Sequence, residues 1–419
     1  MFRKTLLLSL SIVVLAAGAC TAPLVQSAPA ETPLPPPAAV TANQPVPSAP
    51  AQNRLPEPII TGNSVEICMN SRYSEHGLTG AASNQQIANV LWAAGKAPVT
   101  GSYRNIYIAT PTGEYEYAPG THSLSQHSDQ KVTGYTNFFS RLNERAFVIN
   151  GDSNLIFDTG AAYPLAILSS VSLGKSSETA LANCPVLTTL HFGVQEVRAL
   201  TSELAAHSSV PQSDPGWLPD PSTNGQNKIE EVLANLKYSN KFSLDNLTLQ
   251  QISQLLWAGY GCTPHVAVAG RRGLTVPSAS ARYYLTGMIY LVNEKGTYRY
   301  QNRNPKTDLT SADHRIDPVS STDTRSKLQA AVSGLPQAPC YMVICLPKTG
   351  WRITQDKDFA MEGAGFVAAN VLLQASAIGL GCNFETTLTS DEQLGIQKLT
   401  GIPTSDIPQV IISIGGQAK

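Results

Sequence analysis

The stretch of this chain whose residue types could most directly do chemistry contains Lys237, Ser239 and Lys241. They alternate along a short segment, and an amphipathic helix follows soon after. A cation and a hydroxyl at the start of a helix can hold a phosphate, because the helix N-terminus also favours an anion. Taken singly, Lys237 and Lys241 are equally well explained as solvated surface charges.

The same pattern occurs once more in the first half of the chain. Arg72-Tyr73-Ser74 precedes QQIANVLWAA at residues 85–94, and Lys237-Tyr238-Ser239 precedes QQISQLLWAG at residues 250–259. Both matches have the same offset of 165 residues, without a gap. Two copies at so long a period are too few for a solenoid. The sequence therefore predicts a duplicated domain.

The secondary structure predicted around the two copies follows the same order. In each copy the apolar residues of the repeated block recur at helical spacing, and two short strands joined by a turn come next. The hairpins match at an offset of 183, so 18 residues are inserted between helix and hairpin in the second copy. The predicted helices span 84–94, 188–206, 229–236, 248–258 and 362–381, and the predicted strands span 105–109, 114–117, 146–150, 155–157, 290–292, 296–300, 340–346 and 409–414.

Two features set the second copy apart. Its insertion contains Pro277 and Ser278, and its last long helix closes on Gly379-Leu380-Gly381. Small side chains let a backbone or a flat ligand approach closely. An ordinary loop and a helix C-cap explain the same residues without a ligand.

The later parts of the two copies align less directly. Strand 340–346 is set against 155–157, and Gly365 is set against Gly193. In that alignment His207-Ser208-Ser209 stands where the second copy has its Gly-Leu-Gly turn. The first copy is therefore predicted to lack both the inserted loop and the turn.

Three motifs of the second copy resemble the nitroreductase superfamily of flavin-dependent oxidoreductases, in particular its SagB-type (thiazole/oxazole dehydrogenase-like) branch. Residues 237–241 followed by LTLQQISQLLWAG are similar to R-x-S-x-R/K followed by L-T-L-x-x-L-x-x-L-L-W-A. PSASARYYL at 277–285 is similar to P-S-A-G-A-x-Y-P-L. Gly365-x4-Asn370 leading to Gly379-Leu380-Gly381 is similar to G-x4-N-L-L-L leading to G-L-G.

The resemblance implies an α+β fold: two tandem nitroreductase-like domains, each an antiparallel or mixed sheet flanked by helices, form an intramolecular pseudo-dimer with FMN between them. It implies that Lys237 and Ser239 hold the FMN phosphate and that Lys241 approaches the pyrimidine edge of the ring. It also implies that backbone near Gly379 and Gly381 faces the reactive ring nitrogen.

Pro277 and Ser278 line the flavin ring by the same resemblance. Because the family takes this loop from the opposite subunit, Arg72 and Ser74 of the first copy are further candidates for binding the cofactor. Lys237 stands where the family has Arg and cannot grip a phosphate bidentately. A composite site combines phosphate-binding residues of one copy with the ring-lining loop of the other. Neither of the two possible composite sites is complete, so we expect one FMN at most.

The predicted function is that of an FMN-dependent oxidoreductase that acts on a small molecule or peptide outside the cytoplasm. The flavin would carry the hydride or electron chemistry, and no catalytic side chain is predicted. The alternative is a cofactor-free pseudoenzyme that serves as an exported ligand-binding or interaction module, since the first copy has lost motifs. The cysteine spacing includes no C-x-x-C, so no metal site is predicted.

The N-terminus has the pattern of a bacterial secretory signal. Two basic residues precede an apolar run over 6–17, which is too short to span a membrane stably, and small residues lead into Cys20. We expect lipidation of Cys20, with ordinary cleavage after Ala19 as the alternative. The Pro- and Ala-rich residues 21–60 cannot bury a core and predict a tether. The expected product is an exported lipoprotein that contacts the membrane only through its lipid.

Composition sets the remaining limits. The net charge is −1 and 14% of residues are charged, so there is no basic stripe for nucleic acid. Cys340 and Cys345 lie at an odd separation in one predicted strand, which puts them on opposite faces. We expect a monomer divided into a signal peptide (1–20), a tether (21–60), a degenerate first domain (61–210), a linker (211–227) and a second domain with the better-kept flavin motifs (228–419).

Overall fold

The chain divides into two units, residues 1–44 and 45–419, and the computed structural model describes residues of the second unit only. They are 54–60, 62–72, 83–97, 104–110, 113–128, 137–142, six positions between 161 and 169, 176–181, 187–193, 216–266, 271–278, 281–303, 312–353 and 356–418. The predictions for the signal peptide, for Cys20 and Ser74, and for strands at 146–150 and 155–157 lie outside the described residues.

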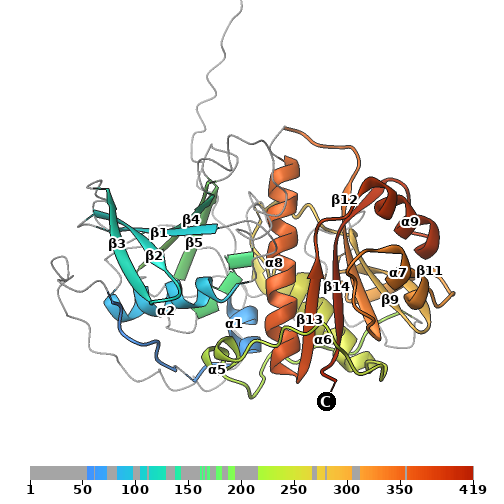
Figure 1. Cartoon of the computed structure of the whole chain (residues 1–419), viewed down its shortest axis with the longest axis horizontal. Coiled ribbons are helices and arrows are strands. Elements are labelled where there is room, and N and C mark those ends of the chain that lie inside the picture. Colours follow the sequence, from blue (N-terminus) through green and yellow to red (C-terminus); the bar gives the residue numbers. More distant parts are fainter. Residues whose placement is uncertain are drawn as a thin grey trace, which may run out of the picture. The chain divides into compact units, whose positions relative to one another are not determined.

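The second half of the chain, residues 216–418, contains a six-stranded antiparallel sheet with helices on both faces. Its elements are α5 (Ile229–Ala234), α6 (Leu249–Tyr260), β7 (Cys262–Val266), β8 (Arg272–Leu274), β9 (Ile289–Asn293), β10 (Gly296–Gln301), β11 (Arg315–Ser320), α7 (Arg325–Ala331), β12 (Cys340–Pro347), α8 (Asp356–Ala377), β13 (Leu380–Glu385), α9 (Ser390–Thr400) and β14 (Asp406–Gly416). The strand order is β11-β10-β9-β12-β14-β13, and β7 and β8 form a separate pair. The long helix α8 packs against α6 and the central strands, and α7 and α9 pack together (Figure 1).

The central strand β12 is buried on both faces. Cys340 and Met342 join the apolar cluster that contains α6 and α8, whereas Tyr341, Val343 and Cys345 join the one that contains residues of α7 and α9. The predicted placement of Cys340 and Cys345 on opposite faces is confirmed, and both thiols are free. The continuous apolar run of this strand is therefore explained by two covered faces.

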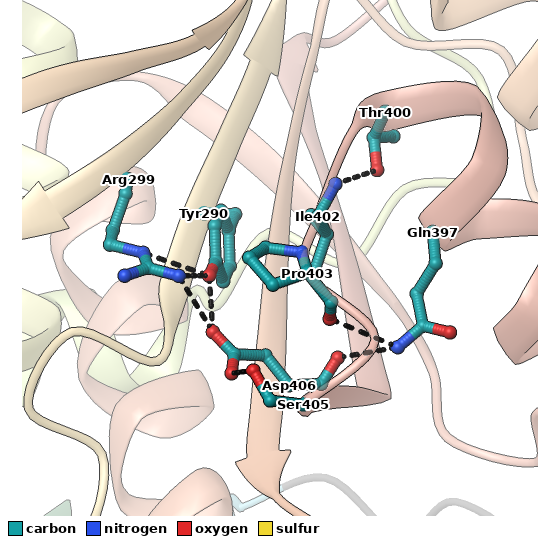
Figure 2. Close-up of polar contacts among 8 residues, drawn as sticks. All are labelled: Tyr290, Arg299, Gln397, Thr400, Ile402, Pro403, Ser405 and Asp406. Atoms are coloured by element: carbon teal, nitrogen blue, oxygen red, sulfur yellow. Dashed lines mark hydrogen bonds and ion pairs between the residues drawn. The ribbon is translucent and has the colours of Figure 1, made fainter.

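A polar network closes one end of this sheet (Figure 2). The Tyr290 hydroxyl donates to the Asp406 carboxylate, and Arg299 Nη2 donates to the same oxygen at 2.8 Å. Gln397 Nε2 donates to the backbone oxygen of Asp406 at 2.9 Å. Burial and the neighbouring carboxylate raise the pKa of Tyr290, so its hydroxyl stays protonated. The network ties β9, β10, α9 and β14 together.

The first half, residues 54–193, contains a second six-stranded sheet. Its elements are α1 (Val65–Ser71), α2 (Asn84–Gly95), β1 (Arg104–Thr110), β2 (Gly113–Ala118), β3 (Ser123–Ser128), β4 (Asn137–Leu142), β5 (Ser176–Leu181) and β6 (Leu187–Gly193). The order β3-β2-β1-β4-β6-β5 repeats that of the second sheet, strand for strand. Ile108 pairs with Tyr115 in one hairpin and Leu291 pairs with Tyr298 in the other, which is the predicted offset of 183.

The predicted helix at 188–206 is wrong over its first six positions, because residues 187–193 form strand β6, paired with β4 and β5. The apolar stripe that suggested the helix starts at Val194, beyond the strand. The alignment of Gly193 with Gly365 fails for the same reason, since Gly193 ends a strand while Gly365 lies inside α8. By sheet order, the counterpart of β12 is β4 and not 155–157.

The helix predicted at 362–381 exists but has different ends. It begins at Asp356 and ends at Ala377, and Leu380 already belongs to β13. Gly379 adopts a left-handed conformation with φ +82°, which favours glycine and breaks the helix. The Gly-Leu-Gly motif is thus a turn that leads into a strand.

The repeated helices α2 and α6 are confirmed, and both begin with a capping box, Ser83 with Gln86 and Thr248 with Gln251. Each also anchors a proline-rich segment that precedes it. Gln85 Nε2 donates to the Glu57 oxygen at 2.8 Å. Its counterpart Gln250 donates to the Asp220 oxygen at 3.0 Å. The segments concerned read LPEP at 55–58 and LPDP at 218–221.

The two halves meet through reciprocal backbone hydrogen bonds. Val65 N donates to Asn227 O at 3.2 Å, and Ile229 N donates to Asn63 O at 2.9 Å. Ser64 and Lys228 form a bridge between them. The described part of the predicted linker, 216–227, is therefore packed against the fold. Among the described residues, no helix combines the length and apolar character needed to cross a membrane.

Candidate functional site

Lys237, Ser239 and Gly381 lie together in the structure. Ser239 N donates to Cys382 O at 2.9 Å, and Cys382 N donates to Lys237 O at 3.0 Å. A side chain on Gly381 would meet Ser239 Cβ and Lys237 O, both at 3.2 Å. The structure thus joins the basic stretch to the Gly-Leu-Gly turn, and glycine is what permits the close approach.

The predicted setting of this stretch at a helix start is wrong. Residues 237–242 run along the edge of the sheet formed by β13 and β14, and Tyr238 bridges Cys382. The following helix is capped by Thr248, seven positions after Lys241. Ser239 Oγ donates to Lys241 O at 2.5 Å. Its hydroxyl therefore stabilises a local turn, and no helix N-terminus adds to the charge of Lys237.

Arg72 of the first half meets the inserted loop of the second half. Its buried guanidinium donates to Thr275 O at 3.2 Å, to Val276 O at 3.3 Å and to Leu274 O. These carbonyls directly precede Pro277 and Ser278. Arg72 therefore contacts the residues just before the predicted ring-lining pair. Burial lowers the pKa of Arg72.

Arg303 extends this cationic region. Its Nη2 donates to Arg272 O at 2.9 Å, so Arg303 and Arg72 together occupy carbonyls of the edge strand β8. The Arg303 guanidinium lies 4.8 Å from the ring centre of Tyr283. In the part of the chain that the structure describes, neither Arg72 nor Arg303 has a carboxylate partner, and Arg303 Nε has no hydrogen-bond partner. Buried cations of this kind favour an anion.

The loop after Ser278 is strained. Ala281 and Tyr283 are non-glycine residues with φ +50°, a conformation that concentrates at functional sites. Ser278 holds the loop from both sides, because its Oγ accepts from Tyr283 N at 2.8 Å and its carbonyl accepts from Ala281 N at 3.0 Å. The Tyr284 hydroxyl donates to Asp356 Oδ1 at 2.8 Å.

The Asp356 carboxylate fixes this loop to the start of α8. Although burial opposes its ionisation, hydrogen bonds from Tyr284 and from the amides of Arg352 and Ile353 lower the pKa of Asp356. Arg282 pairs with it as well. The Asp356 carboxylate is therefore charged at neutral pH.

A small cavity adjoins Pro277 and Ser278. Its volume is about 20 Å³, enough for about one water molecule. The α8 side of the cavity includes Phe359, Glu362 and Phe366, which share one helix face. The cavity is far too small for a flavin ring.

Among the residues that sequence reasoning missed, Arg303 is the most informative. It follows β10 without a motif around it, and only the fold brings it to Arg72. Strand β8 was not predicted either, because three residues are too short for a periodic pattern.

Comparison with known proteins identifies the family of this chain. The model of the nitroreductase family matches residues 239–416. A nitroreductase-like protein of Methanocaldococcus jannaschii is 30% identical over 195 residues, which cover 43% of this chain and 89% of that protein. The chain belongs to the nitroreductase family.

A solved structure extends the match beyond the second half. A nitroreductase-like protein of Anabaena variabilis superposes with a TM-score of 0.56 at 13% identity, covering 80% of this chain and 88% of that one. At that identity the likeness concerns the fold alone. The family match of 239–416 includes Ser239, Lys241 and the inserted loop, and leaves Lys237 and Arg72 outside it.

Proposed function

We propose that this nitroreductase-family chain is an FMN-dependent oxidoreductase built from two tandem nitroreductase-like domains. The observation that carries the proposal is the contact of Arg72, from the first half, with the carbonyls that precede Pro277 and Ser278 in the second half. In this family arrangement a phosphate-binding residue and a ring-lining loop come from opposite domains. A single chain would then contain both partners of the dimer.

Three observations support the tandem arrangement. The two sheets have the same strand order. The backbone contacts of Val65 with Asn227 and of Ile229 with Asn63 are reciprocal, which is the signature of a twofold interface. The match to the Anabaena variabilis structure covers 80% of the chain, so it extends well into the first half.

The charge around Arg72 suits the FMN phosphate, although the cavity at Pro277 and Ser278 is too small for the flavin ring. Arg72 and Arg303 would hold the phosphate, since buried guanidinium groups without a carboxylate suit a dianion. Pro277 and Ser278 would line the ring. Bound FMN would supply the hydride or electron chemistry, while the chain's own residues position it and exclude water. The motif likeness supports assignment to the SagB-type branch and leaves the substrate open.

The second composite group consists of Lys237, Ser239, Lys241, Gly379 and Gly381. It suits FMN less well than the residues around Arg72. The Ser239 hydroxyl is engaged with Lys241 O, and Lys241 is exposed. No helix start adds to the site. We therefore infer that the phosphate binds at Arg72.

A cofactor-free module is the second candidate function, and the cavity beside Pro277 is the observation that favours it. At about 20 Å³ it is far smaller than the sites that hold cofactors. A visible absorption spectrum of the purified full-length chain, followed by FMN titration, separates the candidates. Flavin bands at about one FMN per chain support the enzyme, and a colourless chain that does not take up FMN supports the module.

Matched variants test the choice of phosphate site. Arg72→Gln should weaken FMN binding about tenfold or more, whereas Lys237→Gln should change it little. Arg72→Lys, which keeps the charge, serves as the folding control. A larger loss for Lys237→Gln would move the phosphate to Lys237 and Ser239.

We also propose that the chain is exported and anchored by lipid at Cys20. The support is the signal-like N-terminus and the Pro- and Ala-rich composition of residues 21–53. Cys20→Ser should release the protein from membranes into the soluble fraction on cell fractionation. Unchanged membrane association of the variant would contradict lipidation.

A further inference from the structure

The first half contains a pocket of about 590 Å³ beside the end of α2. It lies between that helix, the end of β2 and the segment that precedes α1, and its lining includes Arg54, Trp92, Lys96, Tyr117, Pro119 and His122. The volume falls within the range of small-molecule sites. None of these residues is among those predicted to bind flavin, so a ligand bound in this pocket is independent of the flavin proposal.

The pocket exists because the equivalent tryptophan is fully buried in the second half and only half-buried in the first. In the second half β7 follows α6 at once, and the Trp257 indole nitrogen donates to Cys262 O at 3.1 Å. Trp257 is consequently 2% exposed. Among the described residues of the first half, no strand pair corresponds to β7 and β8, and Trp92 is only half-buried. The absence of the insertion thus leaves an aromatic surface open to a ligand.

The charge of the pocket is positive. The ammonium of Lys96 lies 5.3 Å from the ring centre of Trp92, and no carboxylate pairs with it in the described part of the chain. Arg54 and Glu57, at the same pocket, neutralise each other in an ion pair. Lys96 is therefore the uncompensated charge among the described lining residues.

His122 forms one wall of the pocket, and two contacts hold its ring in place. Its Nε2 donates to Pro56 O at 2.9 Å, and its Nδ1 lies 2.7 Å from the Tyr117 hydroxyl oxygen. Both ring nitrogens are engaged. His122 also has φ +50°, a strained conformation for a residue with a side chain. Such strain is typical of ligand sites, where the surrounding structure holds it in place.

We propose that this pocket binds a planar aromatic anion, such as an aryl carboxylate. The ring would lie against Trp92, Tyr117 and Pro119, and the anionic group would pair with Lys96. A cation is disfavoured because the net charge of the described lining is positive. A purely apolar ligand would leave the Lys96 ammonium without a counter-charge.

Three probes of one shape and different charge test the proposal on the full-length chain. They are 2-naphthoate, 2-naphthylmethanol and 2-naphthylmethylamine, titrated by isothermal calorimetry. We expect 2-naphthoate to bind at least tenfold more tightly than the alcohol and the amine to bind most weakly. Equal affinities, or tightest binding of the amine, would overturn the proposal.

Two variants locate the site. Lys96→Ala should remove the preference for the anion, and Lys348→Ala, which removes an exposed lysine of the second half, should leave it unchanged. Naphthoate should quench tryptophan fluorescence in Trp351→Phe and lose most of this effect in Trp92→Phe. Loss of the preference in the Lys348 variant alone would place the anion elsewhere and contradict the assignment.

Competition with FMN completes the test. Tyr238, beside Lys237, donates to Lys96 O at 3.5 Å, so the pocket adjoins the second composite group. We expect saturating FMN to leave the affinity for 2-naphthoate unchanged. Loss of naphthoate binding in FMN would show that the pocket is a flavin site and would overturn the proposal.

Discussion

The same tyrosine–histidine pair occurs in both halves, but the second ring nitrogen of the histidine has a different partner in each half. The Tyr117 and His122 rings lie 5.6 Å apart and nearly perpendicular, and those of Tyr300 and His314 lie 5.7 Å apart in the same manner. His122 reaches Pro56 O directly. His314 instead contacts Ser253 Oγ at 2.7 Å.

The difference follows from one position of the repeated helix. Ser253 of α6 corresponds to Ala88 of α2 at the offset of 165. Its hydroxyl stands between His314 and the carbonyl of Pro219, to which it donates. The two halves therefore share one hydrogen-bonded frame, and they diverge where loops are added or single polar groups are exchanged.

The largest expected difference between the halves concerns the paired tryptophans. Trp257→Ala should lower the free energy of unfolding by about 3–5 kcal/mol, because it empties a fully buried site. Trp92→Ala should cost roughly half as much, since Trp92 is half-buried. Urea unfolding of the full-length variants measures both. Equal losses would contradict the idea that the insertion sets the burial of this position.

A second expected difference lies in the network around Asp406, which the first half cannot form in the same way. At the offset of 183, Glu116 stands where the second half has Arg299. Asp406→Ala should lower the free energy of unfolding by about 3 kcal/mol, because Arg299 and Tyr290 lose their common partner. Asp323→Ala removes a more exposed pair with Arg325 and should cost under about 1 kcal/mol in the same urea experiment.

The elements that the sequence predicted best are those specified by local signals. The helices at 84–94 and 248–258 carry both their apolar spacing and their capping residues within a dozen positions. The two hairpins are specified by a turn and its flanking strands, and their registers agree with the offset of 183. Such features need no information from the rest of the chain.

The failures involve strands whose partners are distant in the chain. Strand β6 was assigned to a helix because its pairing with β4 and β5 leaves no local trace. The LPEP and LPDP segments were visible but were assigned to a tether and a linker, since prolines usually interrupt structure. Only their hydrogen bonds to His122 and His314 reveal them as parts of the repeat.

The candidate site was predicted in part, and largely through the family resemblance. The proximity of Ser239 to Gly381 and the contact of Arg72 with residues 274–276 both agree with it. Arg303 carried no signal, because a single arginine after a strand is most often a surface residue. The assignment of each residue to a flavin stays a prediction.

Alkaline pH should reveal Tyr300, one of several buried tyrosines of the second half. Burial raises the pKa of Tyr300 well above its usual value of about 10. A raised pKa in the folded state contributes stability that is fully present below pH 10. This contribution is lost as the pH rises further, because the unfolded chain releases its proton first. Tyr300 alone should therefore lower the free energy of unfolding by roughly 1 kcal/mol one pH unit above 10, in addition to the fall caused by other tyrosines of raised pKa, such as Tyr260 and Tyr290. In Tyr300→Phe this fall should be smaller, and an identical pH profile would contradict the assignment.

The smallest effect is expected from a variant that gives one half the hydrogen-bond pattern of the other. Ser253→Ala gives α6 the residue that α2 has, and His314 is then expected to turn toward Pro219 O as His122 does toward Pro56 O. Because one hydrogen bond replaces two and no charge is exposed, the variant should lose only about 1 kcal/mol of unfolding free energy. Urea unfolding gives the energy, and the imidazole NMR signals of His314 report its new partner. A loss of about 3 kcal/mol or more would mean that His314 cannot reach the carbonyl, and that the halves differ in backbone placement and not only in side chains.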